Sequence, residues 1–247
     1  MSADPRPTDK SFGFYKRRQA AISRRRLVPV TAFYTSYSLL LLILASRTAH
    51  PYLAAAFFLA GVPVWTIVEY LFHRFVLHGR FKRSKKFYKK FYMGLANKYL
   101  DPLHWEHHAR PTDALHISGQ LKDLLPLFAV AVPLSFIFPL YTTPVLLAGT
   151  IQSYVAEEWI HHCLHFYNFR NRYFRHIKGY HLYHHSSHGI KMGFGITSGF
   201  WDIVFGTRFP ARIRQRLSGP GRAAGRLASD NLSEAAHGAP RAAARRS

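Results

Sequence analysis

The sequence predicts an all-α, multi-pass membrane protein with four transmembrane helices arranged as two hairpins. Three observations predict it: four apolar runs without charge, very short links within each pair of runs, and a concentration of basic residues on the opposite side of the runs. The first three runs approach or reach the roughly 17–25 residues that a helix needs to cross a bilayer, and the fourth is shorter. Four buried helices of a soluble bundle are the alternative, but soluble helices keep a charged stripe that these runs lack.

The first hairpin combines two uncharged runs, residues 27–46 and residues 51–68. The second run continues through Glu69 to residue 72, and the link from Arg47 to His50 is only four residues long. A link of this length allows only a tight turn, so the two helices are expected to be antiparallel neighbours.

The second hairpin combines residues 124–141 and 144–156, joined by Thr142 and Thr143. Its last helix reaches about residue 160 if Glu157 and Glu158 face protein and not lipid. An acidic residue at the end of a membrane helix is costly without a partner, which makes both carboxylates candidates for a function.

Basic residues set the predicted orientation. The formal net charge is +22, residues 16–26 are strongly basic, and residues 74–98 hold nine Lys or Arg and no acid. Positive residues favour the cytoplasmic side, so both termini and the central segment are placed there. The charge therefore indicates contact with anionic lipid, and no nucleic-acid partner is expected.

These features divide the chain into three parts. Residues 1–26 form a basic cytoplasmic segment, residues 27–209 a membrane domain, and residues 210–247 an Arg- and Ala-rich tail expected to be disordered. The composition of the tail favours a bacterial inner membrane over the endoplasmic reticulum. The single Cys excludes a disulfide framework and a Cys-based metal site.

The sequence also contains four clusters of histidine. In a helix of about 100° per residue, positions three and four apart share a face. The members of the second, third and fourth clusters therefore share a face within each cluster. His73 and His78 lie about 140° apart, so one of them lies past a helix end or a bend, or binds a different metal ion. The clusters are His73 and His78; His104, His107 and His108; His161 and His165; and His181, His184 and His185.

The predicted topology brings the four clusters to one membrane face. Ten imidazoles exceed the four ligands that one zinc ion takes, so two metal ions fit better. Neutral imidazole suits zinc, copper, iron or nickel, and the ligand type leaves the metal open.

Further polar residues lie near the clusters. Carboxylates are expected to orient the metal ligands by accepting from the free ring N–H. The candidates are Glu69, Glu106, Asp113, Glu157, Glu158 and Asp202. Three more histidines fall outside the repeated spacing and are weaker metal candidates: His162, His176 and His188.

At these residues the chain resembles the fatty acid hydroxylase superfamily of integral-membrane di-iron enzymes, which includes sterol desaturases, and within it the fatty acid 2-hydroxylases. The resemblance covers about residues 55–209. It rests on EYLFHRFVLH, HWEHHARPTD, EEWIHHCLH and, most specifically, the stretch from Gly179 to Thr207 that ends in WDIVFGT. The basic aromatic stretch between His78 and His104 has no clear counterpart and is expected to lie on lipid headgroups.

The resemblance implies four membrane helices, a cytoplasmic helical cap and two iron ions, with zinc possible in purified protein. It implies O2 as co-substrate and hydroxylation of a lipid C–H bond, most simply on the fatty acyl chain of a membrane lipid. No cytochrome b5-like segment precedes residue 27, so a separate electron donor is expected, either a cytochrome b5-like protein, a ferredoxin or a reductase. Lipid or sterol desaturases and carotenoid or aminolipid hydroxylases remain alternatives.

Other functional classes fit less well. A zinc metalloprotease needs a His-Glu-x-x-His helix, which does not occur. A metal transporter places its ligands near the middle of the bilayer, whereas these histidines cluster at helix ends. A non-catalytic metal-binding or lipid-binding membrane protein remains open.

Overall fold

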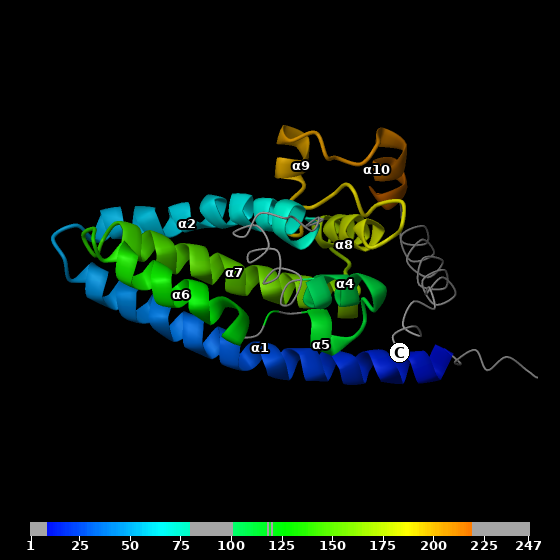
Figure 1. Cartoon of the computed structure of the whole chain (residues 1–247), viewed down its shortest axis with the longest axis horizontal. Helices are drawn as coiled ribbons and strands as arrows, with labels where there is room; N and C mark the ends of the chain where they lie inside the picture. Colours follow the sequence, from blue (N-terminus) through cyan, green and yellow to red (C-terminus); the bar gives the residue numbers. More distant parts are fainter. Residues whose placement is uncertain (1–8, 80–100, 118, 120, 219–247) are drawn as a thin grey trace, which may run out of the picture.

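The computed structural model describes residues 9–79, 101–117, 119 and 121–218, and these residues form helices and no strands. The all-α prediction is therefore confirmed for this part of the chain (Figure 1). The elements are α1 (Asp9–Ser46), α2 (Pro51–Leu71), the π-helix η1 (Phe72–Leu77), α4 (Asp101–Ala109), α5 (Ala114–Ile117), α6 (Leu121–Ser135), α7 (Thr143–Phe166), α8 (Arg172–His184), α9 (Phe200–Val204) and α10 (Ala211–Ser218).

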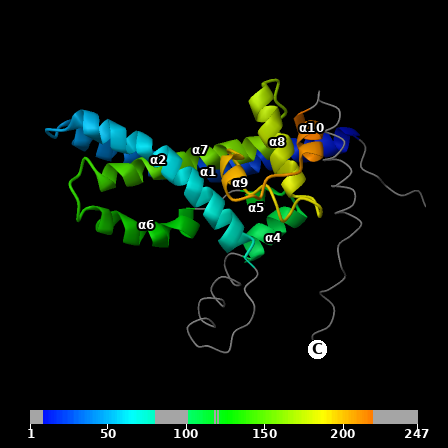
Figure 2. The same ribbon diagram turned by 90° about the horizontal axis from the view of Figure 1, so that it is seen from above.

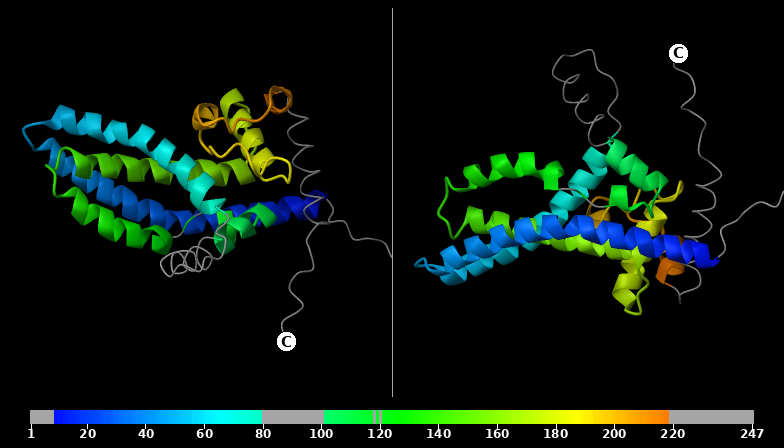
Figure 3. Two further views of the ribbon diagram at one scale, coloured as in Figure 1. Left: turned by 45° about the horizontal axis from the view of Figure 1, so that its top comes forward. Right: turned by 90° about the horizontal axis from the view of Figure 1, so that it is seen from below.

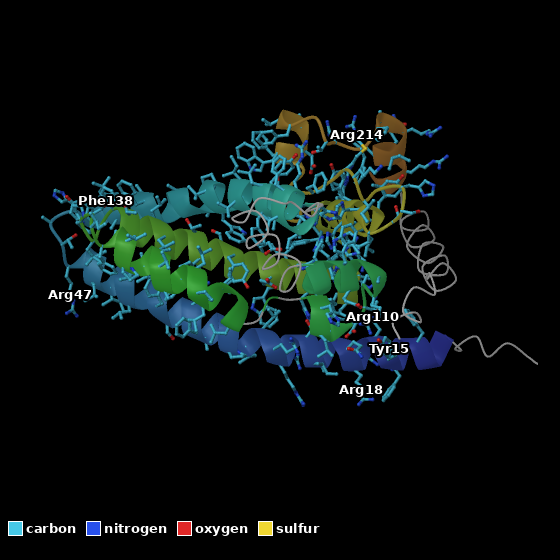
Figure 4. The ribbon with its side chains drawn as sticks, in the orientation of Figure 1. Tyr15, Arg18, Arg47, Arg110, Phe138 and Arg214 are labelled. Atoms are coloured by element: carbon cyan, nitrogen blue, oxygen red, sulfur yellow. The ribbon has the colours of Figure 1, made fainter. Side chains whose placement is uncertain are left out.

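The long helices α1, α2, α6 and α7 form an elongated bundle (Figure 1). The α1–α2 turn, with Arg47, and the α6–α7 turn, with Phe138, lie at the same end of the molecule (Figure 4). This arrangement agrees with the two predicted hairpins.

Two helices are long and apolar enough to cross a membrane, Phe12–Ser46 and Pro51–Leu77, and Leu124–Ser135 is apolar but shorter. The predicted third run extended to residue 141, whereas α6 ends at Ser135. Pro139 has no N–H to bond the carbonyl of Ser135, which favours a helix end there, although α6 accommodates Pro126 and Pro133 in its interior.

The basic N-terminal segment, as far as it is described, is continuous with the first apolar helix. The 38 residues of α1 span about 57 Å at 1.5 Å per residue, well beyond the roughly 30 Å hydrocarbon core of a bilayer. Its N-terminal half packs beside α5, where Ala20, Ile117 and Phe166 form a small buried cluster. The Gln19 side chain also accepts a hydrogen bond from the Ala114 N–H.

The expectation of a disordered tail from residue 210 is wrong for its first residues. Residues 211–218 form α10, and Leu217 packs in a buried cluster with Phe209 and Tyr180. The apolar side chains of this short helix pack against the protein, although its Arg-rich composition had indicated a disordered segment. Residues 219–247 lie outside the described residues.

The remaining helices form a cap at the end of the bundle opposite the hairpin turns. Helices α8, α9 and α10 lie on one side of the bundle axis, and α4 and α5 on another (Figures 2 and 3). Arg110 and Arg214 mark these two sides of the cap in Figure 4.

Helices α2 and α7 approach each other closely at two glycines. A Cβ atom on Gly149 would lie 2.0 Å from the Phe58 carbonyl oxygen, and one on Gly61 would lie 2.3 Å from the Thr150 nitrogen. Both neighbours are backbone atoms, so the helices would have to separate to accommodate a side chain.

We therefore expect Gly149→Ala to destabilise the protein by about 1–3 kcal/mol through overpacking. Gly13→Ala is the control, because its nearest atom is the flexible end of Arg17 at 4.0 Å. Thermal unfolding in detergent should show a lower midpoint for the first variant only, and equal midpoints would contradict the close helix contact.

Candidate metal centre

The ten histidines predicted as metal ligands lie together at the cap end of the bundle in two groups of five. Within each group, one potential ligand atom per residue lies within 4.8 Å of all the others. Group A consists of His73, His78, His104, His108 and His184. Group B consists of His107, His161, His165, His181 and His185.

The π-helix η1 solves the spacing problem of His73 and His78. The N–H of His78 donates to the carbonyl of His73 at 3.0 Å, a bond over five residues that defines a π turn. This wider turn rotates the two side chains onto one face, and their ring centroids lie 4.9 Å apart. The five-residue spacing was the sequence signal for this turn, and the bend expected there takes this form.

Helices α4 and α8 each contribute to both groups. On α4, His104 and His108 belong to group A and His107 to group B. On α8, His184 belongs to group A, while His181 and the following His185 belong to group B. A shared helix face therefore does not mean a shared metal ion. The rings of His108 and His185 stack at 4.2 Å, so the two groups are in direct contact.

Within each group the rings converge through their Nε2 atoms. In group A the Nε2 of His78 lies 2.8 Å from that of His104 and 3.0 Å from that of His184. In group B five such pairs lie 2.9–3.1 Å apart. The Nε2 of His108 is buried without a hydrogen-bond partner among the described residues.

This spacing fits donors that share a metal ion. Two nitrogens bound at about 2.1 Å to one ion lie about 3.0 Å apart at a right angle and about 3.4 Å apart at the tetrahedral angle. The observed distances match the right angle.

Burial keeps these imidazoles neutral. It lowers the pKa values of His107 and His181 well below the usual range, and the neighbouring His161 and His165 lower them further. Burial similarly lowers the pKa of His184. Neutral imidazole is the form that binds a metal ion, so these rings are ready to bind at neutral pH.

Backbone carbonyls, and not the expected carboxylates, orient two of the rings. The Nδ1–H of His73 donates to the carbonyl of Phe194, and that of His184 donates to the carbonyl of Met192 at 2.7 Å. Each bond directs Nε2 of its ring toward the centre of the group.

The candidate carboxylates have other partners. Glu69 and Asp202 are buried and accept hydrogen bonds from backbone N–H groups of residues 194–197. Glu158 accepts from the Gly119 N–H, and Asp113 accepts from the Leu115 N–H. Glu157 is buried on α7, and Glu106 pairs with Arg110 on the surface.

The three weaker candidates lie outside both groups. His162 is buried, and its Nδ1 lies 2.8 Å from the Ser23 hydroxyl of α1. His176 packs against Tyr180. His188 is exposed beside Ser187. Residues 80–100, with most of the basic aromatic stretch, lie outside the described residues.

Comparison with known proteins identifies similar sequences and a similar structure. The fatty acid hydroxylase family model matches residues 58–207. A dihydroceramide fatty acyl 2-hydroxylase of Arabidopsis thaliana is 36% identical over 151 residues, which cover 60% of this chain and 58% of the relative. A ceramide very long chain fatty acid hydroxylase of Saccharomyces cerevisiae is 34% identical over 66% of this chain and 40% of the relative.

The human fatty acid 2-hydroxylase is 27% identical over 74% of this chain and 45% of its own length. The solved structure of full-length Scs7p, in which only the hydroxylase domain is visible, superposes with a TM-score of 0.63 at 29% identity. That match covers 73% of this chain and 66% of the Scs7p chain. The matched part of this chain is thus 58% or less of the length of each of these curated relatives.

The two groups predict the metal content of variants. We expect about two metal ions per chain, because a zinc-like ion needs about four protein ligands and each group offers five. Two double variants, His78→Ala with His184→Ala and His165→Ala with His181→Ala, should each retain about one. The control His188→Ala should retain both when metal is measured by mass spectrometry. A parent chain with one metal ion or none would contradict this prediction.

Proposed function

Because the chain belongs to the fatty acid hydroxylase family, we propose that it is an oxidoreductase that uses O2 to hydroxylate a C–H bond of a membrane lipid. The observation that carries the proposal is the pair of five-histidine groups at one end of an apolar helix bundle. A lipid bilayer around the bundle would bring an acyl chain near this end without exposing it to water.

The reaction requires a redox-active metal. One C–H bond and O2, with two electrons and two protons, give one C–OH group and one water. When bound, two iron ions would activate O2, and the protein would supply position and electrostatics. Zinc in purified protein would show occupation of the same ligands without this redox chemistry.

The side chains and backbone of groups A and B and their surroundings have three roles. The ten imidazoles offer neutral donors. The carbonyls of Met192 and Phe194 fix two rings of group A. The Phe194 side chain is buried against group A, with its ring 5.3 Å from His78 and 5.5 Å from His184. It excludes water from that side of the site, which favours a reaction that water would otherwise intercept.

The relatives suggest the substrate. Their names describe fatty acid 2-hydroxylases and hydroxylases of ceramide or dihydroceramide acyl chains. We therefore favour the acyl chain of a membrane lipid, oxidised next to its carbonyl group. The two electrons would come from a separate donor such as a cytochrome b5-like protein, a ferredoxin or a reductase.

The same proposal includes four membrane spans with both termini and the metal groups in the cytoplasm. Besides the two helices that are long enough to cross, α6 and α7 would complete the second hairpin. The short hairpin turns, with Arg47, would then face the opposite side of the membrane.

This topology predicts which positions an impermeant thiol reagent reaches. In a Cys163→Ser background, intact cells should label Ala49→Cys in the first hairpin turn and leave Arg175→Cys on α8 unlabelled until they are permeabilised. Both positions are exposed in the structure. Equal labelling of the two positions in intact cells would contradict the topology.

Lipid mass spectrometry tests the activity. Cells that express the intact chain with a suitable electron donor should contain a lipid that has gained 16 mass units, the mass of one oxygen atom. Cells that express a His184→Ala, His185→Ala variant should not, because each group has lost a donor. His188→Ala should behave as the parent does.

The alternatives give different results in this measurement. A loss of two mass units would indicate a desaturase. A shift on a sterol, a carotenoid or an aminolipid would replace the acyl-chain substrate. No change with the donor present, from a chain that binds metal, would favour a non-catalytic metal-binding protein.

A further inference from the structure

Residues 192–197 form a loop within the connection between α8 and α9, and this loop contacts group A directly. Its carbonyls at Met192 and Phe194 accept the ring N–H groups of His184 and His73. These two rings come from different helices, so the loop sets the relative orientation of donors that the helices themselves do not connect.

Two buried carboxylates bind the other side of this loop. Asp202 accepts the N–H groups of Phe194 and Gly195 at 2.9 and 3.0 Å. Glu69 accepts those of Ile196 and Thr197 at 2.6 and 3.3 Å. Four successive backbone N–H groups therefore have carboxylate acceptors, and charge-assisted bonds of this kind are stronger than neutral ones.

Each carboxylate is itself held in place. Glu69 lies on α2 one helical turn before His73 and also accepts from the Thr197 hydroxyl at 2.8 Å. Asp202 is fully buried and accepts from the Thr207 hydroxyl at 2.7 Å. Since a buried carboxylate without hydrogen bonds is costly, the carboxylates and the loop stabilise each other.

The backbone path of the loop requires glycine at two positions. Gly193 has a φ angle of +70°, and a Cβ atom there would lie 2.3 Å from the Phe209 ring. A Cβ atom on Gly195 would lie 1.9 Å from the Ser198 carbonyl oxygen. The backbone must therefore pass close to its neighbours, and only glycine fits at these two positions.

Group B has no comparable support among the described residues. The buried Nδ1 atoms of His107, His165 and His185 have no hydrogen-bond partner in the described part of the chain. A change in the loop should therefore act on one group much more than on the other.

We propose that Glu69 and Asp202 are positioning residues for group A, which act by fixing the loop whose carbonyls orient His73 and His184. The proposal rests on the proposed function only in taking group A to be a metal site. It assigns the two carboxylates a role through the backbone and no direct contact with metal or substrate.

The test compares Glu69→Gln and Asp202→Asn with the matched change Glu106→Gln, which alters an exposed carboxylate paired with Arg110. Each full-length protein is purified with its bound metal and titrated with a chelator. Loss of a ligand's outer partner typically weakens metal binding by roughly 10–100-fold. In the first two variants we expect one of the two ions to be released at a correspondingly lower chelator concentration, with the other ion and Glu106→Gln unchanged.

Equal weakening of both ions, or no weakening of either, would overturn the proposal. If the two variants do not fold, Thr197→Val decides, because it removes one hydroxyl that binds Glu69 and preserves the side-chain shape. Thr197→Val should weaken one ion selectively, and an unchanged release profile would overturn the proposal. The metal readout does not depend on turnover, so a chain that hydroxylates no lipid but still shows selective release would refute the proposed function alone.

Discussion

The structure depends on the convergence of ten imidazole nitrogens in a buried volume. Five imidazole nitrogens that lie within 4.8 Å of one another repel each other through their lone pairs unless a cation lies among them. Burial keeps the rings neutral and in the form that binds such a cation. These donors come from four segments of the chain. The helices that carry them must therefore place their donor-bearing ends at one end of the molecule, and the arrangement of the long helices in two hairpins makes this possible.

The close contact between α2 and α7 links the bundle to the metal groups. Gly61 and Gly149 allow the two helices to touch along their backbones, and their C-terminal ends then bring His73 and His161 to one end of the molecule. The short helices α4 and α8 complete both groups at once, since each places residues on both sides. Because η1, which continues α2, places two donors in group A and α7 carries two donors of group B, the contact between α2 and α7 also sets how the two groups lie relative to each other.

The acidic residues stabilise the surroundings of the donors and not the donors themselves. Glu69 and Asp202 bind successive backbone N–H groups, which satisfies buried charge without placing a carboxylate on a ligand ring. The rings instead bond to carbonyls, which are weaker acceptors and leave the donor set neutral. The Trp-Asp motif, distant from the histidine boxes, is thereby linked to one of them: Asp202 accepts from the Phe194 N–H, and the Phe194 carbonyl accepts from the His73 ring.

The sequence by itself determined the helical class, the two hairpins and the ten clustered histidines, because apolar runs and spacings of three and four residues are local properties. It missed the helical start of the tail, since the burial of Leu217 depends on Phe209 and Tyr180. Only the tertiary structure decided how the donors divide, because helices α4 and α8 cross between two groups that no spacing distinguishes. It also decided the contacts of Glu69, whose partners Ile196 and Thr197 lie more than 120 residues away. Such contacts depend on how the chain packs, which helical periodicity does not encode.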